Sequence, residues 1–460
     1  MKNNSKLDIQ ENDILELTID DIGSNGEGIA HYGEMTVFVP YAITGEKVSA
    51  KVIHIRRNMI YTVLKKVIEP SVDRVEAGCP LFGTCGGCSL MHLSYEAQLA
   101  VKAKNLATIL KKNSGLTTSI SDVVASCNLH YRNKIQLPFG TEHGAVVMGF
   151  YREKTHRIIP LSNCPLHADW ADKLIEITKG FANAARLSSY NEQTGKGLLR
   201  HLVARYIGGG LTVTLVINGR QVPKIQQYVA LLTEAFSNVS VYLSVNTIRN
   251  NVIMGKELIA VKPTAQTVNI MGIDVDVNPM SFFQINDYIR DKIYSDVVEM
   301  VAPTSDSIVI DAYSGVGLLG AIMAKMGAQI YNIEIIPEAI IDANNLYKNN
   351  DIERQAVNIC GDSVLELGAL ITRLDLNSSA SEKCVTIILD PPRKGVAEEV
   401  LKAINALTIK YKLIYISCNP ATLSRDLTHL LDTHSITSIT PYDMFPNTPH
   451  LETVALLERI

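Results

Sequence analysis

The pattern of apolar and polar positions first separates an N-terminal part from the rest of the chain. Over residues 7–66, short runs alternate apolar and polar residues, and glycine turns such as Gly23–Gly28 separate the runs. Such alternation is typical of half-buried strands. We expect strands at 15–19, 36–39, 47–53 and 60–64. Short strands joined in this way suit a small β-barrel of the OB type.

The C-terminal part follows a different rhythm. From residue 276 onwards, helical stretches alternate with apolar runs at 307–311, 329–333, 356–359, 385–389 and 412–416. Continuous apolar strands separated by helices are typical of a parallel, doubly wound α/β sheet. We therefore expect an α/β domain over residues 271–460.

The middle of the chain reads as a mixed α/β region. A helix is expected over 95–112, a strand at 211–217 and a second helix at 224–236. A chain of 460 residues is too long for one ordinary domain. We predict three domains, over 5–66, 76–270 and 271–460.

Charge and hydropathy narrow the class of protein. The net charge of −4 speaks against wholesale electrostatic binding of nucleic acid but leaves room for a local basic face. Residues 47–66 hold six basic side chains and no acidic one, a pattern that suits RNA contact and a merely solvated face equally well. No apolar run is long enough to span a bilayer, and the first residues lack the apolar segment of a secretory signal. We expect a cytoplasmic protein.

A glycine turn follows the first strand of the C-terminal sheet. Gly315 and Gly317 come directly after the apolar run that ends at Asp311, and Glu334 ends the next strand about 20 residues further on. Glycines at such a turn let the backbone approach a ligand, and a carboxylate at the second strand end can bind ribose hydroxyls. Asp362 follows a third strand in the same way. Three such carboxylates favour S-adenosylmethionine over a dinucleotide, although they can also simply cap the following helices.

Eight cysteines are present, and three of them, Cys79, Cys85 and Cys88, lie within ten residues. In a cytoplasmic protein this crowding favours a metal or cluster site over disulfides. With Cys164 they make four thiolates, which can hold either a tetrahedral zinc or an iron–sulfur cluster. Cys127, Cys360 and Cys384 are expected to be ordinary residues in or near the core.

Two loops carry the candidate chemistry. Asp390-Pro-Pro-Arg393 and Ser417-Cys418-Asn419-Pro420 each follow an apolar run, so both should emerge at the carboxyl edge of the sheet. A thiolate that adds to C6 of a pyrimidine makes C5 able to attack a sulfonium methyl group, and a base must then remove the C5 proton. Cys418 suits the first task, and Glu452 near the C-terminus suits the second.

With these residues the chain resembles the RNA (uracil-5-)-methyltransferases, specifically the bacterial ribosomal RNA branch that carries an iron–sulfur cluster. The resemblance implies an OB-like TRAM domain at the N-terminus, a central α/β iron–sulfur domain and a C-terminal Rossmann-like S-adenosylmethionine-dependent methyltransferase domain. It also implies that the stretch at 97–125 is a helix that packs with the catalytic domain.

The resemblance assigns roles residue by residue. Cys418 falls on the nucleophile and Glu452 on the proton acceptor. Ser281-Phe-Phe-Gln284-Ile-Asn286 is similar to the family's Phe-Gln-x-Asn element. The implied cofactor contacts are Gln284, Tyr313, Glu334 and Asp390, and the implied [4Fe-4S] ligands are Cys79, Cys85, Cys88 and Cys164.

The expected reaction is methyl transfer from S-adenosylmethionine to C5 of a specific uridine in 23S ribosomal RNA, by a monomeric enzyme that places Arg132 and Lys134 on RNA phosphates. Two alternatives stay open: a uridine of the transfer RNA T-loop, and methylation of an exocyclic amine. Asp-Pro-Pro also occurs in amino-methyltransferases, but there an aromatic residue follows in place of Arg393. That chemistry also needs no nucleophilic cysteine.

Overall fold

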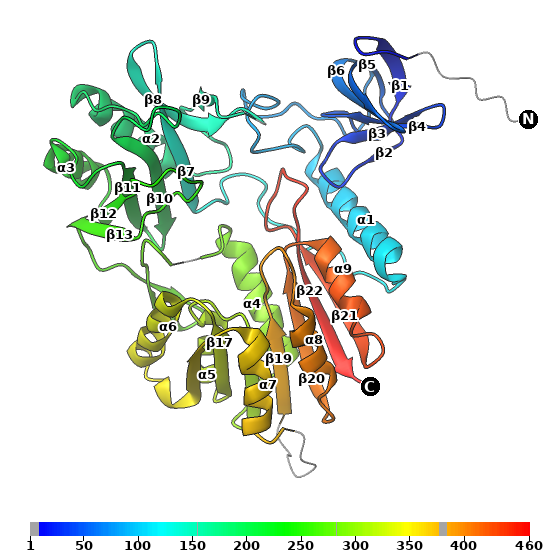
Figure 1. The fold of residues 1–460 in the computed structure, drawn as a ribbon, viewed down its shortest axis with the longest axis vertical. Helices are drawn as coiled ribbons and strands as arrows, with labels where there is room; N and C mark the ends of the chain where they lie inside the picture. The colour runs from blue at the N-terminus through cyan, green and yellow to red at the C-terminus, as the bar shows by residue number, and fades with distance from the viewer. Residues whose placement is uncertain (1–8, 154, 282, 377–383) are drawn as a thin grey trace, which may run out of the picture. The chain divides into compact units, whose positions relative to one another are not determined.

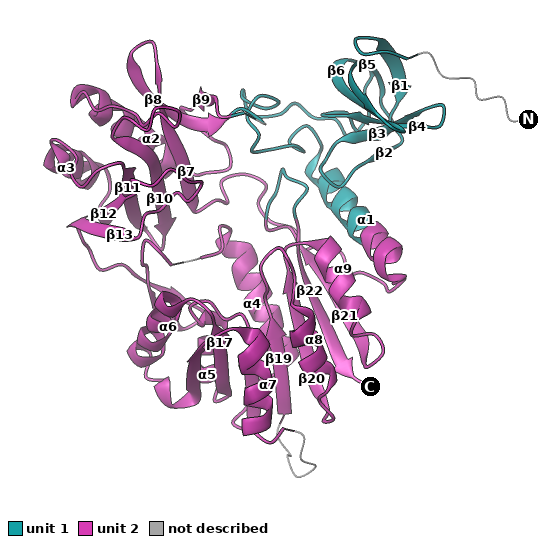
Figure 2. Cartoon of the chain, in the orientation of Figure 1, with its two compact units in different colours: residues 1–106, 152–155, 445–450 teal, residues 107–151, 156–444, 451–460 magenta. Residues whose placement is uncertain are grey.

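The computed structural model describes residues 9–153, 155–281, 283–376 and 384–460. Residues 5–8 of the predicted first domain and Phe282 of the Phe-Gln-x-Asn element lie outside these ranges. The chain forms two compact units, shown in Figure 2. Unit 1 comprises residues 1–106, 152–155 and 445–450, and unit 2 comprises the remainder.

Unit 1 is built around a six-stranded sheet in the order β1-β5-β6-β4-β3-β2, blue in Figure 1. The bounds are β1 Ile14–Thr18, β2 Asp21–Ile22, β3 Gly28–Tyr32, β4 Met35–Val39, β5 Lys47–Arg56 and β6 Met59–Glu69. The four expected strands are confirmed, although β5 and β6 run three and five residues beyond their expected ends. β1 also contacts β3, so the sheet curls back on itself as a barrel does. Alternate residues such as Val48, Ala50 and Val52 of β5 fill its core.

The loop of residues 445–450 belongs to unit 1 and is tied there to α1 (Tyr95–Ser114). Buried Gln98 and Asn447 exchange two hydrogen bonds, of 2.9 and 3.2 Å. The Lys102 ammonium donates to the carbonyl oxygen of Phe445 at 3.1 Å. Leu451 joins this loop to Glu452, the first residue of the last strand.

α1 is shorter than the helix expected over 97–125. It ends at Ser114, and Gly115 follows with a φ of +69°, a left-handed conformation that stops helices. The Ser424 hydroxyl of α9 (Pro420–Thr428) lies 2.9 Å from that of Ser114, within unit 2. No helix in the described ranges has the length and apolarity needed to cross a membrane.

Unit 2 contains two seven-stranded sheets. The first has the order β13-β12-β11-β10-β7-β8-β9, with two helices beside it. The bounds are β7 Lys134–Glu142, β8 Ala145–Tyr151, β9 Ile158–Pro160, α2 Asp169–Ala184, β10 Leu199–Ile207, β11 Gly210–Ile217, α3 Ile225–Ala235, β12 Val239–Val245 and β13 Glu257–Lys262. β11 and α3 agree with the expected strand and helix. A hairpin of β14 (Thr267–Ile270) and β15 (Ile273–Asp276) leads into the second sheet.

The second sheet has the order β18-β17-β16-β19-β20-β22-β21 and is flanked by helices (Figure 1). The bounds are α4 Asp287–Val301, β16 Ser307–Asp311, α5 Leu318–Lys325, β17 Gln329–Glu334, α6 Pro337–Asn349, β18 Ala356–Cys360, α7 Ser363–Arg373, β19 Cys384–Leu389, α8 Glu398–Asn405, β20 Tyr411–Ser417, β21 His434–Tyr442 and β22 Glu452–Arg459. The five strands expected from the apolar runs are confirmed and pair in parallel.

The expectation of a wholly parallel sheet is wrong at one side. β22 inserts between β20 and β21 and runs antiparallel to both. The strand order therefore places the start of β22 beside the end of β20. This detail matters because the two residues with predicted catalytic roles lie at these two positions.

Candidate active site

Strand register brings Cys418 and Glu452 together. In the antiparallel pair of β20 and β22, Ser417 is opposite Thr453. The next residues outward are therefore Cys418, just past the end of β20, and Glu452, the first residue of β22. Residues directly opposite each other in an antiparallel pair point to the same face of the sheet. The thiol and the carboxyl group are thus neighbours.

The pKa values of both groups are raised above their ordinary values. Glu452 is 5% exposed, and burial together with the charge of Asp390 holds the pKa of its carboxyl well above the usual range. Burial, then Glu452 and Asp390, raise the pKa of the Cys418 thiol to about 11. The Arg393 guanidinium opposes both shifts, lowering the pKa of each group. At neutral pH the thiol is protonated in the free protein.

The two motif loops are held together by α9. The side-chain amide of Asn419, the N-cap residue of α9, donates to the Arg393 carbonyl oxygen at 3.0 Å and its oxygen accepts from the Ala421 N–H. Buried Asp426 accepts from the Val396 N–H at 2.8 Å and from the Tyr415 hydroxyl at 2.6 Å. These bonds fix where Arg393 leaves the backbone, and therefore where its charge acts.

Two further carboxyl groups border the site. Asp311 is 4% exposed, and burial, Asp390 and Glu334 raise its pKa to about 7, against a hydrogen bond from the Tyr313 N–H. Asp390 is open to solvent, yet the protein packed around it raises its pKa to about 7 as well.

The backbone of the glycine turn is hydrogen-bonded to the Glu334 carboxylate. Gly315 adopts a φ of +55° and has open space where a side chain would stand. Its N–H donates to the Glu334 carboxylate at 3.0 Å, and the other oxygen of that carboxylate accepts from the Ile336 N–H at 2.9 Å. The open cradle beside a half-buried carboxylate fits the ribose and amino acid parts of S-adenosylmethionine.

The remaining predicted cofactor contacts border the same edge. Tyr313 lies in the turn itself, half-buried, and burial raises its pKa to about 12. The Gln284 backbone is held by the side-chain amide of Asn133, which donates to its carbonyl oxygen at 2.9 Å. Exposed Asp362 caps α7 by accepting from the Val364 N–H, so the capping interpretation holds for this residue.

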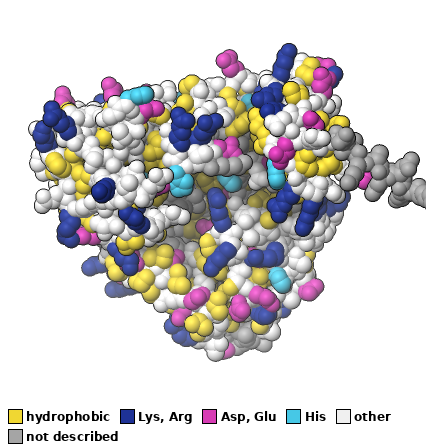
Figure 3. Space-filling model, turned by 45° about the horizontal axis from the view of Figure 1, so that its top comes forward, with side chains coloured by type: hydrophobic (Ala, Val, Ile, Leu, Met, Phe, Trp, Pro, Cys, Tyr) yellow, Lys and Arg dark blue, Asp and Glu magenta, His cyan; other side chains and the backbone are white. Residues whose placement is uncertain are grey.

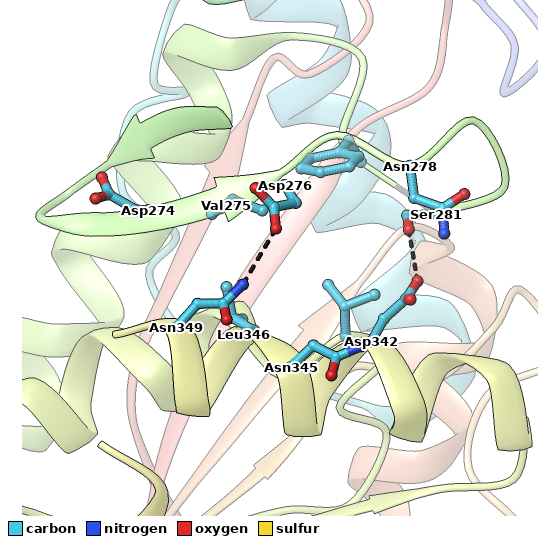
Figure 4. A pocket seen from close by; sticks show the side chains of 11 residues that line it. Asp274, Val275, Asp276, Asn278, Ser281, Asp342, Asn345, Leu346 and Asn349 are labelled. Carbon is cyan, nitrogen blue, oxygen red and sulfur yellow. Dashed lines mark hydrogen bonds between the residues drawn. The ribbon is translucent and has the colours of Figure 1, made fainter. Parts of the chain in front are cut away.

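A pocket is lined by Val316 of the glycine turn and by residues of the segment just before Gln284. It lies between the β14–β15 hairpin and α6, and Val316 of the turn lines it (Figure 4). The Ser281 hydroxyl donates to Asp342 at 2.8 Å, and the Asn349 amide donates to Asp276 at 3.1 Å. These bonds fasten the hairpin and the segment after it onto α6.

The cysteines of the predicted quartet divide between the two units. Cys79, Cys85 and Cys88 lie in unit 1 and Cys164 in unit 2, all half-buried. Within unit 1, burial and then the charge of Cys79 raise the pKa of Cys85, against a backbone hydrogen bond at Gly87. Among the residues that the structure describes, no three His, Cys, Asp or Glu side chains form a group that could hold a metal ion.

The other cysteines differ from the expectation. Cys127, Cys360 and Cys384 are all exposed, so their placement in or near the core is wrong. Cys360 and Cys384 end and begin strands, where the apolar pattern gives no information on burial.

Three residues that motif reasoning left without a role belong to this site. Arg393 sets the charge at Cys418 and Glu452, and Asp426 anchors its loop. Tyr294 of α4 interacts electrostatically with Asp390 and Asp311, and burial raises its pKa. Tyr294 stands on a helix before the first strand of the sheet, where no motif draws attention to it. The Arg393 motif was visible in the sequence, but its charge effect needs the fold.

Comparison with known proteins agrees with this geometry. The family model described as tRNA (Uracil-5-)-methyltransferase matches residues 94–460, and that of the TRAM domain matches residues 9–61. A protein of Clostridium acetobutylicum named uncharacterized RNA methyltransferase is 34% identical over 463 residues, covering 99% of each chain. One of Halalkalibacterium halodurans with the same description is 35% identical over 461 residues, covering 98% of each.

Among solved structures, the chain is similar to Pyrococcus abyssi tRNA (uracil-54, C5)-methyltransferase in complex with S-adenosyl-L-homocysteine. The TM-score is 0.75 at 27% identity, and the match covers 96% of this chain and 99% of that one. The N-terminal β-domain and the α/β methyltransferase fold expected from the sequence are thereby confirmed. Because a family model spans most of its length and relatives match it from end to end, this chain belongs to the tRNA (uracil-5-)-methyltransferase family.

Proposed function

We propose that the protein transfers a methyl group from S-adenosylmethionine to C5 of a specific uridine in 23S ribosomal RNA. The observation that carries this proposal is the pairing of Cys418 with Glu452 across β20 and β22, next to Asp390 and Arg393. A nucleophile and a buried carboxyl group at one sheet edge are the two groups that C5 chemistry requires.

The chemistry assigned to these residues runs in three steps. The Cys418 thiol gives its proton to solvent as the target base binds, favoured by the Arg393 cation, and the sulfur adds to C6 of uracil, which moves the electrons of the C5–C6 double bond to C5 and the neighbouring carbonyl group. C5 then forms its bond to the methyl carbon that bound S-adenosylmethionine would supply, while the sulfur–methyl bond breaks with its electron pair left on sulfur, so that S-adenosylhomocysteine is the leaving product. The Glu452 carboxylate accepts the C5 proton, and the carbon–sulfur bond breaks so that the thiolate leaves and the ring double bond returns.

The other residues bind and orient. We infer that Gln284, Tyr313 and Glu334 contact the cofactor, and that Asp390 contacts the cofactor and hydrogen-bonds the uracil edge. Their placement around the open glycine turn supports this assignment. The target uridine must leave its stack to reach Cys418, as bases do in enzymes that modify them.

Two classes of RNA are candidate substrates. The TRAM match and the cysteine quartet favour 23S ribosomal RNA, as the resemblance of the sequence implies. A transfer RNA T-loop uridine is the second candidate, supported by the likeness to the Pyrococcus abyssi transfer RNA enzyme. Methylation of an exocyclic amine is disfavoured because that reaction requires neither a nucleophile such as Cys418 nor a base such as Glu452 that removes a ring proton. A cytoplasmic location and a monomeric state remain predictions from the sequence.

The substrate test uses unmodified transcripts of 23S ribosomal RNA and of transfer RNA, each incubated with the protein and methyl-labelled S-adenosylmethionine. Nucleoside analysis should find 5-methyluridine in the ribosomal transcript. Label in the transfer RNA alone would replace the ribosomal proposal, and a methylated adenine, guanine or cytosine would contradict C5 chemistry altogether.

We further propose that Cys79, Cys85, Cys88 and Cys164 bind a [4Fe-4S] cluster in a structural role. The support is the thiol spacing and the family resemblance. Protein purified without oxygen should contain iron and acid-labile sulfide in equal amounts. Cys88→Ser should lose both, whereas Cys127→Ser, an exposed cysteine outside the quartet, should keep them. Full iron content in Cys88→Ser would contradict the assignment.

A further inference from the structure

Three rings form a stacked column on the barrel of unit 1. The Tyr61 ring of β6 lies between the rings of its two register partners, Phe38 on β4 and His54 on β5. The ring centres of Phe38 and Tyr61 are 5.3 Å apart at an interplanar angle of 19°. Those of Tyr61 and His54 are 6.2 Å apart at 27°. Three neighbouring strands thus contribute one ring each.

The column stands on the outer face of the barrel. Val37 and Val39, the neighbours of Phe38 in sequence, are fully buried, so the Phe38 ring points away from the core. Phe38 and Tyr61 are half-buried, whereas His54 at the end of the column keeps 59% of its side chain exposed. Cross-strand pairing of rings stabilises a sheet, which accounts for the inner two rings. The exposed ring at the end remains to be explained.

One face of the His54 ring is open. The other face stacks on Tyr61, and the ladder between β1 and β5 covers only Lys47–Lys51, so it ends before His54. The Glu11 carboxylate lies 3.3 Å from Nδ1 of His54. A hydrogen bond to a ring nitrogen lies near the plane of the ring, so this contact leaves the open face uncovered. A planar ligand could therefore extend the column.

The surroundings indicate which planar ligand fits. Arg56 lies two residues after His54 on the same side of β5, and Arg57 follows at the turn. Both are exposed, and neither pairs with a carboxylate in the described parts of the chain. Ile53, 51% exposed at a bulge of β5, adds an apolar side chain next to His54. Rings beside unpaired cations suit a nucleic acid strand, whose bases stack while its phosphates meet the cations.

We propose that an unpaired base of the substrate RNA stacks on the open face of His54 and extends the column of His54, Tyr61 and Phe38. This inference rests on the proposed function and adds to it a base contact in unit 1. Cations alone attract paired and unpaired strands alike, because both carry phosphates. Stacking on a protein ring requires a base that has left its own stack. The RNA bound here is therefore a loop or another single-stranded segment.

The test measures binding of a single-stranded RNA of mixed sequence and about 12 nucleotides, a length that one OB-type barrel can cover. A duplex of the same sequence is measured in parallel, both without S-adenosylmethionine and over a range of salt concentrations. His54→Ala should weaken binding of the single strand about five- to a hundredfold, the range for one stacked base, and leave the duplex unaffected. Because stacking neutralises no phosphate, the slope of log K against log salt should stay at the wild-type value.

Two controls separate the ring from charge and from folding. His54→Phe keeps a ring without the imidazole nitrogens and should restore most of the affinity. His31→Ala removes another exposed histidine of the same barrel, on β3, that is likewise paired with a carboxylate, Asp20, at 2.8 Å. His31 stacks on no ring among the described residues, so its removal should change nothing.

Three results would overturn the inference: unchanged single-strand affinity in His54→Ala, an equal loss of affinity for the duplex, or no recovery in His54→Phe. Failure of the proposed function would look different. A wild-type protein that binds the single strand through His54 but methylates no uridine at C5 would refute the proposed function and leave the base contact standing.

Discussion

The reactivity of Cys418 is set by charges from three different elements. Glu452 and Asp390 raise the pKa of its thiol, whereas Arg393 lowers it. In the free protein the carboxylates and burial prevail, which protects the thiol from oxidation and alkylation. In the proposed reaction, binding of an RNA base at this edge would change these surroundings, so that Cys418 would become reactive only when the substrate is bound.

Replacement of Glu452 by glutamine separates the two halves of the proposed reaction. The change removes an anion, so the pKa of Cys418 should fall and its alkylation by iodoacetamide should begin at lower pH. Addition to C6 and methyl transfer can still occur, but no carboxylate accepts the C5 proton. We expect turnover to drop by about two to four orders of magnitude, as loss of a general base does, while a protein–RNA adduct accumulates on ordinary RNA.

The matched control is Glu458→Gln, an exposed carboxylate on the same strand, which should leave alkylation and turnover unchanged. Turnover of Glu452→Gln at the wild-type rate would remove Glu452 from the mechanism.

Asp311 should make stability depend on pH. Its folded pKa of about 7 lies above its ordinary value, so the folded state favours the protonated form. Its contribution is fully present below the ordinary carboxyl pKa and is lost as the pH rises through about 7. Asp311→Asn mimics the protonated group. The variant should melt at about the wild-type temperature near pH 4 and at a higher temperature at pH 8. At pH 8 its free energy of unfolding should exceed that of the wild type by up to about 4 kcal/mol. A variant that is less stable than the wild type at pH 8 would contradict this assignment.

At the scale of elements, the first turn of α9 organises both motif loops. Asn419 uses its side-chain oxygen to cap α9 and its side-chain nitrogen to hold the carbonyl oxygen of Arg393. One residue thus links the position of the nucleophile to that of the neighbouring cation. The Pro420 that follows is well suited to the first turn of a helix, because its missing N–H would have no partner there.

Two substitutions of Asn419 distinguish these tasks. Asn419→Asp keeps the capping oxygen and removes the donor to Arg393, so stability should stay near the wild-type value while the reactivity of Cys418 changes. Asn419→Ala removes both and should also cost about 1 kcal/mol of stability through the lost cap. Thermal unfolding and the pH profile of Cys418 alkylation provide the two measurements. Identical pH profiles for wild type and Asn419→Asp would show that the tether to Arg393 is without consequence.

The elements that the sequence could predict have a regular pattern of apolar residues, either alternating, as in β1 and β5, or nearly continuous, as in the parallel strands of the second sheet. β16, β19 and β20 are mostly apolar and almost wholly buried because helices cover both faces, and their bounds agree with the expected runs to within one residue. The candidate site could be predicted from the loops that follow them, because parallel strands deliver their ends to one edge.

What the sequence could not predict depends on pairing between distant segments. The insertion of β22 beside β20 requires a strand direction and order that periodicity does not encode. Without it, Glu452 reads as a surface carboxylate at a chain end. The ring column of Phe38, Tyr61 and His54 was hidden for the same reason, since its members come from three strands and only the register brings them together.

At the scale of the whole molecule, charge is distributed in local groups. Figure 3 shows basic side chains interspersed with acidic ones on the face in view, in keeping with the net charge of −4. Association with RNA must then rely on particular clusters. The β5–β6 hairpin carries exposed cations at two places, Arg56 and Arg57 at its turn and Lys65 and Lys66 further along β6.

Replacing Lys65 and Lys66 by glutamine tests whether this hairpin binds RNA or is only solvated. If it binds, affinity should fall alike for the 23S and transfer RNA transcripts, and the salt slope should drop by about 0.7–1 for each phosphate that is no longer neutralised. Binding of S-adenosylhomocysteine should not change. Lys104→Gln, an exposed lysine paired with Asp21 in the same unit, is the control. RNA affinity that stays at the wild-type value would favour the solvated face.

The measurement that tests the central claim most directly is covalent trapping with 23S ribosomal RNA carrying 5-fluorouridine, in the presence of S-adenosylmethionine. Fluorine at C5 cannot be removed as a proton, so the bond between Cys418 and C6 should persist as a protein–RNA adduct that survives denaturation. The account predicts this adduct in the wild-type protein, its loss in Cys418→Ala and its retention in Cys127→Ser. Methyl transfer to ordinary RNA without any adduct would contradict the role of Cys418 as nucleophile.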